Sequence, residues 1–187
     1  MRDQIILFLG YGYVAKAVAR RLRAAGWRAR ATWRREEQAA DLAADGVAGV
    51  PWRDGKIDLS AFESVDAILV STPPGERGCP ALAAAREALG GRLPKWVGYL
   101  STNGVYGDHG GAVVDETSPL LATSPRGRAR IDAENAWRDY AYTHGFLLVI
   151  FRLPGIYGPG RSAFDQIRDG RAQRIYKPGQ VFRPQRR

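Results

Sequence analysis

The sequence predicts an α/β fold with a doubly wound parallel sheet and helices on both faces of the sheet. Two observations indicate this fold. An apolar run at residues 5–9, rich in strand formers, leads into a glycine-rich turn and then into a helical pattern with apolar residues at Val14, Val18 and Leu22. Strand and helix patterns then alternate along the chain, as in parallel sheets that are covered on both faces. Six strands of this kind complete a Rossmann-type sheet.

The remaining elements follow in chain order. We predict strands at residues 5–9, 27–33, 47–50, 65–70, 95–100 and 146–152. We predict helices from the glycine turn to Gly26 and at residues 36–44, 80–89 and 125–144, with a turn at residues 52–55 and with Gly90 and Gly91 ending the helix at 80–89. The helix at 125–144 has the clearest limits, because Ser124 is a good N-cap and Pro125 suits the first turn.

Length and composition indicate one globular domain. The 187 residues are enough for a substantial core, and 45% of them are apolar. The single cysteine, Cys79, cannot form an internal disulfide, and the longest apolar runs are far too short to cross a bilayer. The first apolar run continues directly into the glycine turn, so we expect no signal peptide. These features predict a cytoplasmic protein without membrane contact.

The net charge of +9 is unevenly distributed. Residues 168–187 contain seven basic residues and one acidic residue, so this segment supplies +6 of the total. The rest of the chain is only mildly basic, and it shows no basic stripe interleaved with aromatics, no helix-turn-helix pattern and no zinc-ligand spacing. We therefore expect no nucleic-acid partner and no metal. A partner-binding role of the basic segment stays as an alternative.

Residues 10–15, between the first strand and the first helix, match the glycine pattern of a dinucleotide-binding turn. Gly10 permits a sharp turn, Gly12 lets the backbone approach a pyrophosphate because it has no Cβ, and Ala15 is small enough for the helix to pack on the strand. The pyrophosphate would bind the free N–H groups at the helix start. The alternative is an ordinary strand-to-helix turn. The predicted pyrophosphate-binding residues are Gly10, Tyr11, Gly12, Tyr13, Val14 and Ala15.

The end of the second strand indicates which cofactor is bound. An NAD site usually has Asp or Glu there, which accepts a hydrogen bond from the ribose 2′-hydroxyl. This chain has Arg34 and Arg35, which can pair with a 2′-phosphate, so we predict NADP in preference to NAD. The alternative is that both arginines are solvated residues at a helix start. Further predicted cofactor contacts are Asp54 at the adenine, and Ser71, Thr72 and Pro73 in the loop after the fourth strand.

Four motifs occur in a characteristic order: the glycine turn, the segment 100–108 with its Ser101-Thr102 pair, the segment 115–119, and the segment 152–160 with its Pro154-Gly155 pair. Together they resemble the extended short-chain dehydrogenase/reductase superfamily, in its NAD-dependent epimerase/dehydratase branch. The resemblance covers residues 4 to about 180. It implies that the ends of the fifth and sixth strands hold the nicotinamide and the substrate hydroxyl or carbonyl. The implied cofactor contacts there are Ser101, Pro154 and Gly155.

The resemblance also implies where the reaction takes place, and there the chain departs from the family pattern. The family uses a Ser or Thr to hydrogen-bond the reacting oxygen, and the matching residue is Thr102, with Ser101 beside it. The family's general acid or base is a Tyr followed four residues later by a Lys, and Arg126 and Arg130 match these positions. Arginine stays protonated, so neither can transfer a proton. Because a spacing of four places them on one helix face, we expect them to hold a phosphate, ribose or carboxylate, or to stabilise an oxyanion.

Two hypotheses of function follow. The first is an NADP(H)-binding oxidoreductase or epimerase/dehydratase-like enzyme acting on a small hydroxyl or carbonyl substrate, with sugar nucleotides among the candidates. Tyr106, Tyr157 and His109 are then candidate replacement acids. The second is a non-catalytic NAD(P)-binding or redox-sensing module, which the two arginines favour. The resemblance also implies a homodimer formed through the helices after the fourth and fifth strands.

We divide the chain into a dinucleotide-binding domain at residues 1–167 and a basic tail at residues 168–187. Extended family members continue beyond this point with another strand and a small substrate-binding lobe. The tail has no periodicity and stops without a closing element. We therefore interpret it as the truncated start of the substrate-binding part, and a truncated or frame-shifted gene product is a hypothesis that resequencing of the gene would test.

Overall fold

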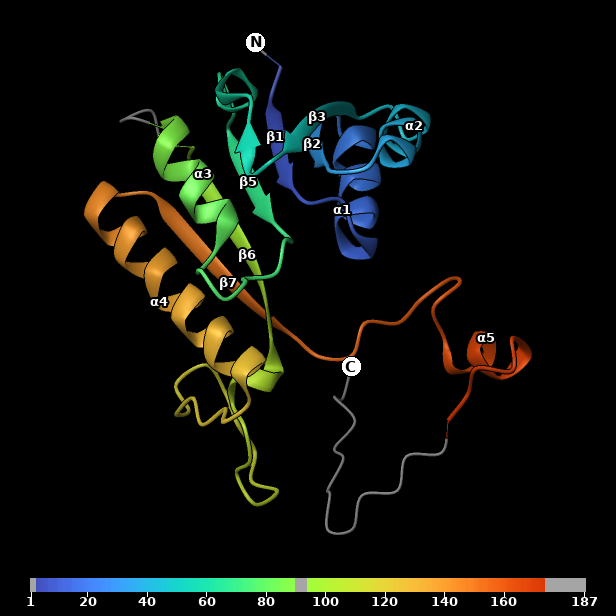
Figure 1. Cartoon of the computed structure of the whole chain (residues 1–187), viewed down its shortest axis with the longest axis vertical. Coiled ribbons are helices and arrows are strands. Elements are labelled where there is room, and N and C mark those ends of the chain that lie inside the picture. The colour runs from blue at the N-terminus through green and yellow to red at the C-terminus, as the bar shows by residue number, and fades with distance from the viewer. Residues whose placement is uncertain (1–2, 90–93, 174–187) are drawn as a thin grey trace.

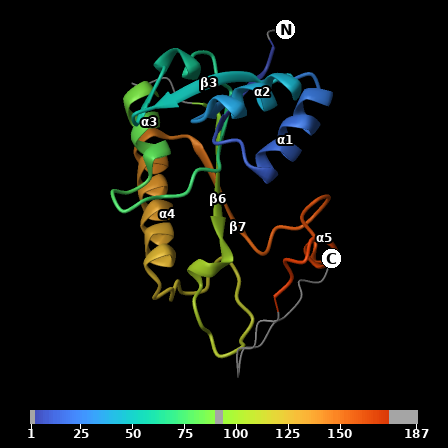
Figure 2. The ribbon, with the colours of Figure 1, turned by 45° about the vertical axis from the view of Figure 1, so that its right-hand side comes forward.

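The computed structural model describes residues 3–89 and 94–173. A seven-stranded sheet forms its centre, in the order β4-β3-β2-β1-β5-β6-β7. Helices α1 and α2 lie on one face of this sheet, and α3 and α4 lie on the other (Figure 1 and Figure 2). The predicted doubly wound α/β fold is confirmed. The helix bounds are α1 Tyr13–Ala24, α2 Glu36–Ala44, α3 Pro80–Leu89 and α4 Pro125–His144.

Parallel pairing joins six of the strands. The chain first builds outward from β1 to β2 and β3, and then returns to the other side of β1 to build β5, β6 and β7. The carboxyl ends of β1, β2, β5 and β6 therefore lie along one edge, where such sheets bind ligands. The strand bounds are β1 Ile5–Leu9, β2 Arg28–Trp33, β3 Ala48–Arg53, β4 Lys56–Ile57, β5 Ala67–Val70, β6 Trp96–Thr102 and β7 Leu147–Leu153.

The seventh strand corrects the prediction of six strands and of a turn at residues 52–55. Trp52 and Arg53 belong to β3, which pairs antiparallel with the two-residue strand β4. Only Asp54 and Gly55 form the turn, with φ angles of 52° and 75°. Two central residues with positive φ are typical of a tight hairpin, which Asp-Gly favours. The hairpin therefore extends the sheet beyond the predicted third strand.

The sheet is buried on both faces, which explains the continuous apolar run of β1. Ile6 and Phe8 belong to one hydrophobic cluster, together with buried residues of α1 and α2. Leu7 and Leu9 belong to a second and larger cluster, which includes Trp137 of α4 and buried residues of α3. Successive side chains of a strand point to opposite faces, so β1 anchors both helical layers.

The covering is less complete at β7. Helix α4 packs on this strand through Leu148 and Ile150, while Leu147 and Phe151 are exposed. After β7 the chain leads away from the sheet to a short helix, α5 (Ala163–Arg168) (Figure 1). This helix crosses the boundary predicted at residue 167, and the division into domain and tail stays a prediction.

Some predicted features lie outside the described residues. They are Gly90 and Gly91 at the end of α3 and residues 174–187 of the basic tail. Within the described ranges, none of the helices combines the length and the apolar character needed to span a membrane.

Candidate functional site

The glycine turn has the geometry that a dinucleotide-binding turn requires. Gly10 has a φ of 96°, and a Cβ built there would lie 2.7 Å from Ser71 Oγ. Its N–H donates a 2.8 Å hydrogen bond to Thr32 Oγ1, which ties β1 to the end of β2. Gly12 is the N-cap of α1, and a Cβ built there would meet nothing within 4 Å. Ala15 is fully buried against the sheet. A side chain at residue 10 would therefore collide with Ser71, whereas the space around residue 12 is empty.

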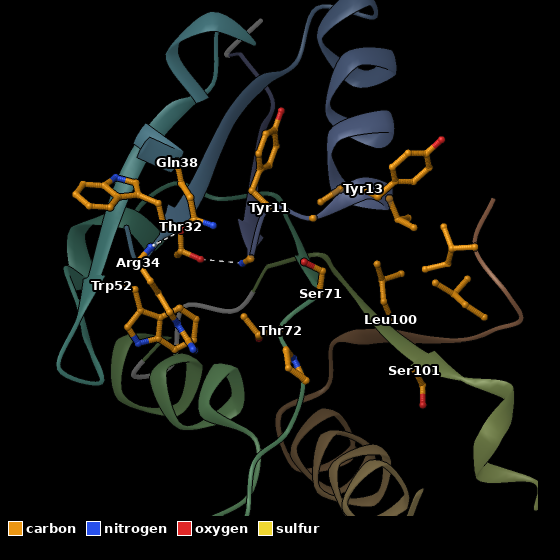
Figure 3. A pocket seen from close by; sticks show the side chains of 18 of the residues that line it. Tyr11, Tyr13, Thr32, Arg34, Gln38, Trp52, Ser71, Thr72, Leu100 and Ser101 are labelled. Carbon is orange, nitrogen blue, oxygen red and sulfur yellow. Dashed lines mark hydrogen bonds between the residues drawn. The ribbon is translucent and has the colours of Figure 1, made fainter. Parts of the chain in front are cut away.

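A cavity of about 380 Å³ lies in front of this turn (Figure 3). It brings together the ends of β1, β2, β5 and β6, the start of α1 and the segment that follows β7. Among the described residues, its lining contains three arginines and no aspartate or glutamate. The lining residues are Gly10, Tyr11, Gly12, Tyr13, Val14, Ala15, Thr32, Trp33, Arg34, Gln38, Trp52, Ser71, Thr72, Pro73, Leu100, Ser101, Arg130, Leu153, Ile156 and Arg161.

Most of the predicted cofactor residues line this cavity. They include the whole glycine turn, Arg34, the Ser71-Thr72-Pro73 loop, Ser101 and Arg130. The lining residues that the sequence analysis did not propose are Thr32, Trp33, Gln38, Trp52, Leu100, Leu153, Ile156 and Arg161. The predicted residues that do not line it are Arg35, Asp54, Thr102, Arg126, Pro154 and Gly155.

Arg34 and Trp52 form the end of the cavity at β2. The Arg34 guanidinium lies 5.1 Å from the centre of the Trp52 ring, within the range of a cation–π contact (Figure 3). Gln38 Oε1 accepts hydrogen bonds from the backbone N–H groups of Arg34 and Arg35, at 3.0 and 3.1 Å, which fixes the start of α2. The Arg34 side chain is exposed, and it makes no ion pair within the described residues. It is free to meet an anion.

Asp54 takes a place other than the one predicted for it. It forms the β3–β4 hairpin turn and lines a neighbouring hollow together with Arg53 and Gly55. Pro154 and Gly155 are exposed, and their neighbours Leu153 and Ile156 line the cavity instead. The direction of a side chain at a strand end depends on the register of the last residues, which the sequence pattern does not settle.

The Thr72 hydroxyl indicates that this cavity suits a polar ligand. Thr72 is 8% exposed, and its Oγ1 has no hydrogen-bond partner in the part of the chain that the structure describes. A buried hydroxyl without a partner costs about 1 to 3 kcal/mol. Since Thr72 also lines the cavity, a ligand with ribose or phosphate oxygens can supply the missing partner. Together with the open approach at Gly12, this fits a dinucleotide.

Ser101 lines the cavity, and its hydroxyl belongs to a buried ion network. Figure 3 shows the Ser101 side chain directed toward α4. There its Oγ donates a 2.6 Å hydrogen bond to Glu134 Oε1. Glu134 has no solvent exposure, and Arg152 and Arg138 donate to its Oε2 at 2.9 and 3.0 Å. Hydrogen bonding to Glu134 raises the pKa of Arg152. This network supports the end of β6 beneath the site.

A second cavity, of about 1100 Å³, adjoins the first and contains Thr102, Arg126 and Arg130. Thr102 Oγ1 accepts a 3.1 Å hydrogen bond from the Gly104 N–H. Arg130 also lines the first cavity, and its Nη1 donates to the Leu100 carbonyl oxygen at 2.9 Å and to the Tyr99 hydroxyl at 3.2 Å. The structure thus places the three residues predicted for the reacting end around one space.

The candidate replacement acids lie elsewhere. The Tyr106 hydroxyl accepts a 3.0 Å hydrogen bond from Arg152, and Tyr106 lines neither of the two cavities. Tyr157 is 79% exposed, and a ring nitrogen of His109 lies 3.1 Å from the Pro119 carbonyl oxygen. Two tyrosines do line the first cavity, but the Tyr11 hydroxyl bonds Asp45 and the Tyr13 hydroxyl bonds the Pro159 carbonyl. Burial, reinforced by Asp45, raises the Tyr11 pKa to about 12.

Comparison with protein families now identifies the kind of protein. The model of the NAD dependent epimerase/dehydratase family matches residues 80–177. The chain belongs to this family. The match includes the second half of the fold, with Thr102, Arg126, Arg130 and the strand β7. No match was found among curated protein sequences.

Several solved structures are similar to this member of the family. A conserved protein of unknown function from Silicibacter pomeroyi DSS is 43% identical, with a TM-score of 0.84 over 96% of this chain and 62% of that protein. A UDP-glucuronic acid 4-epimerase from Bacillus cereus, in complex with NAD, is 20% identical, with a TM-score of 0.72 over 89% and 63%. A short-chain dehydrogenase/reductase superfamily protein from Agrobacterium tumefaciens with bound NAD is 21% identical, with a TM-score of 0.61 over 80% and 48%. The chain therefore spans less than two thirds of the length of these proteins.

Proposed function

We propose that this chain binds NADP(H) in the first cavity and acts as the cofactor-binding part of an oxidoreductase or epimerase/dehydratase. The substrate would be a small molecule with a hydroxyl or carbonyl group. The observation that carries the proposal is the glycine turn, which opens at Gly12 onto a cavity where the strand order of the sheet reverses. Membership of the family and the unpartnered Thr72 hydroxyl support it.

Arg34 is the basis for proposing NADP in preference to NAD. It stands at the end of β2, and no aspartate or glutamate among the described residues lines the cavity to accept from a ribose 2′-hydroxyl. A guanidinium that lies over the Trp52 ring is well placed to pair with a phosphate. Arg35 lies outside the cavity, so we assign the 2′-phosphate to Arg34 alone.

The residues of the reacting end would position the substrate rather than exchange protons with it. When bound, a nicotinamide cofactor supplies hydride transfer at a carbon that bears a hydroxyl or carbonyl group. The Thr102 hydroxyl accepts from Gly104, which leaves its own proton free to donate to the reacting oxygen. Arg130 would stabilise negative charge that develops on that oxygen.

Calorimetric titration with NADPH and, separately, with NADH tests this proposal. We expect NADPH to bind more tightly than NADH, and Arg34→Ala to weaken NADPH binding about tenfold while leaving NADH binding unchanged. A tenfold change corresponds to about 1.4 kcal/mol, which is within the range of a charge-assisted hydrogen bond. Arg35→Ala is the matched control, because Arg35 is also exposed but does not line the cavity. Absence of binding of both cofactors would contradict the proposal.

A non-catalytic NAD(P)-binding or redox-sensing module is the second candidate. It is favoured by Arg126 and Arg130, which stand where the family pattern has an acid or base and cannot transfer protons. The absorbance of reduced nicotinamide, followed with a panel of aldehydes, ketones and sugar nucleotides, separates the two candidates. Oxidation of NADPH would favour the enzyme, whereas tight binding without oxidation would favour the module.

We also propose a cytoplasmic protein that forms a homodimer through α3 and α4. This assembly is implied by the resemblance to the extended superfamily. Light scattering on the purified protein tests it, since a dimer has twice the mass of the chain. A monomer at all concentrations would contradict it.

A further inference from the structure

The second cavity is lined by arginines that make no ion pair with the residues that the structure describes. It lies between the loop after β5 and the first turns of α4. Three arginines and two carboxylates line it, and no ion pair links any of them within the described ranges. The charged lining residues are Glu76, Arg126, Arg128, Arg130 and Asp132.

Arg130 is the most buried of the three arginines that line this cavity. Its Nη1 is held by the Leu100 carbonyl oxygen and the Tyr99 hydroxyl, which fixes the direction of the side chain. Its guanidinium also lies 5.8 Å from the centre of the Tyr99 ring. Its Nε and Nη2 groups bond no described residue, and no carboxylate of the described residues lies within ion-pair distance. A half-buried cation with unused donors and no counter-ion is unfavourable, so an anionic ligand would stabilise this arrangement.

Arg126 provides a second cation on the same side of the helix. It lies one turn before Arg130 on α4, at the spacing that places side chains on one face. It is exposed, and it makes no hydrogen bond or ion pair with any residue that the structure describes. Arg128, between them, donates to the Thr123 carbonyl oxygen and is therefore already engaged. Arg126 and Arg130 can thus both donate hydrogen bonds to one anion.

The position of this pair relates it to the substrate rather than to the cofactor phosphates. Arg130 lines both cavities, whereas Arg126 lines only the second one, together with Thr102. The glycine turn, where the pyrophosphate is proposed to bind, lines only the first. An anion held by both arginines therefore lies beside the proposed reacting position, in space that the cofactor phosphates do not need.

We infer that the substrate bears a carboxylate or phosphate group, which Arg126 and Arg130 bind in the second cavity. This inference rests on the proposed function, since it names the substrate class of the same site. It gives the two arginines a positive role in place of the proton transfer that they cannot perform. The anion fixes the orientation of the substrate while Thr102 meets the reacting oxygen.

Nuclear magnetic resonance of the arginine Nε–H groups tests the inference with simple probes. The protein, saturated with NADPH, is titrated with malonate, with inorganic phosphate, and with malonamide as the neutral counterpart of malonate. We expect saturable shifts of the Arg130 resonance with at least one of the two anions, with a dissociation constant on the order of millimolar, and none with malonamide. Stronger binding of malonate indicates a carboxylate, and stronger binding of phosphate indicates a phosphate.

Matched variants show whether Arg126 and Arg130 bind the anion directly or whether any positive charge on this helix turn attracts it equally. Arg126→Gln is expected to weaken the binding of the preferred anion at least tenfold, because it removes one of two charges without touching the bonds that hold Arg130. Arg128→Gln, on the same helix turn, is expected to weaken it less than twofold. Equal losses in both variants, or shifts that never saturate, would overturn the inference.

The same titration without NADPH separates this inference from the proposed function. Calorimetry first establishes whether NADPH binds, and failure there counts against the proposed function alone, because anion binding is then still measured on the free protein. If NADPH binds and displaces the anion, the anion occupies the cofactor's phosphate site, and the inference is wrong. Retention of anion binding in the presence of NADPH supports it.

Discussion

The two ends of the candidate site are built in different ways. At the pyrophosphate end the shape comes from backbone and small residues, with Gly10 closed against Ser71, Gly12 open and Ala15 buried. At the reacting end the shape comes from long charged side chains, above all Arg130, whose direction depends on partners in β6. An end made of backbone is specified by residue spacing, whereas an end made of side chains is specified by tertiary contacts. Substitutions at each end of the site test this comparison.

The largest loss of stability is expected when the buried ion network of Glu134, beneath the reacting end, is broken. Replacing Glu134 by Ala removes a fully buried carboxylate and leaves Arg152, whose side chain is 11% exposed, without its ion-pair partner. Loss of one member of a buried pair costs about 3 to 5 kcal/mol of unfolding free energy. Urea denaturation measures this loss. Asp139→Asn, an exposed position on the same helix, should change stability by less than about 0.5 kcal/mol. A loss below about 1 kcal/mol at Glu134 would show that the network does not support the fold.

At the pyrophosphate end, Gly10→Ala should mainly lower stability, whereas Gly12→Ala should mainly weaken NADPH binding. Gly10→Ala places a Cβ against Ser71 at a φ of 96°, so we expect a loss of about 1 to 3 kcal/mol in unfolding free energy. Gly12→Ala meets no neighbour, so it should cost less than about 1 kcal/mol. It should nevertheless weaken NADPH binding at least tenfold, because the added methyl group lies in the approach to the turn. Equal NADPH affinity of the Gly12 variant and the natural protein would refute a pyrophosphate at this turn.

The two threonines near the turn sharpen the comparison further. Thr72→Val removes a buried hydroxyl that has no described partner, so stability without cofactor should rise by up to about 1 kcal/mol. The same change should weaken NADPH binding several-fold, as measured by calorimetry. Thr32→Val is the control, because Thr32 Oγ1 accepts from the Gly10 N–H and its loss should destabilise the protein by about 1 kcal/mol. A destabilised Thr72→Val protein would mean that its hydroxyl already serves the fold.

The last prediction concerns the dependence of stability on pH. Burial raises the pKa of Tyr99, whose hydroxyl accepts from Arg130, from 10.0 to about 12. A pKa that is higher in the folded protein gives stability that is fully present below pH 10 and is lost as the pH rises toward about 12. Urea denaturation between pH 9 and about 12 should therefore show a decline that is smaller in Tyr99→Phe. Tyr142→Phe, at a position that is 92% exposed, should leave the decline unchanged.

Much of the fold could be predicted from the sequence because each strand and helix has a local cause. The apolar run of β1, the glycines after it and the Ser124-Pro125 start of α4 all act within a few residues, and the structure has these elements where they were expected. The β3–β4 hairpin was missed although Asp54-Gly55 is a strong hairpin signal, because Trp52 and Arg53 were assigned to the turn.

The site was less predictable because side-chain direction is a tertiary property. Arg34 and Arg35 are adjacent in sequence, yet only Arg34 lines the cavity, since successive side chains leave a strand end in different directions. The ion network of Glu134 brings together residues of β6, α4 and β7, and no spacing rule connects them.

The most direct test of the account is a crystal structure of the protein with NADPH. The account predicts the pyrophosphate on the backbone N–H groups that follow Gly12, the 2′-phosphate on Arg34, and a new hydrogen bond to the Thr72 hydroxyl. It also predicts that the space beside Arg126 stays free for a substrate anion. A cofactor bound away from the glycine turn, or a 2′-phosphate that does not contact Arg34, would contradict it.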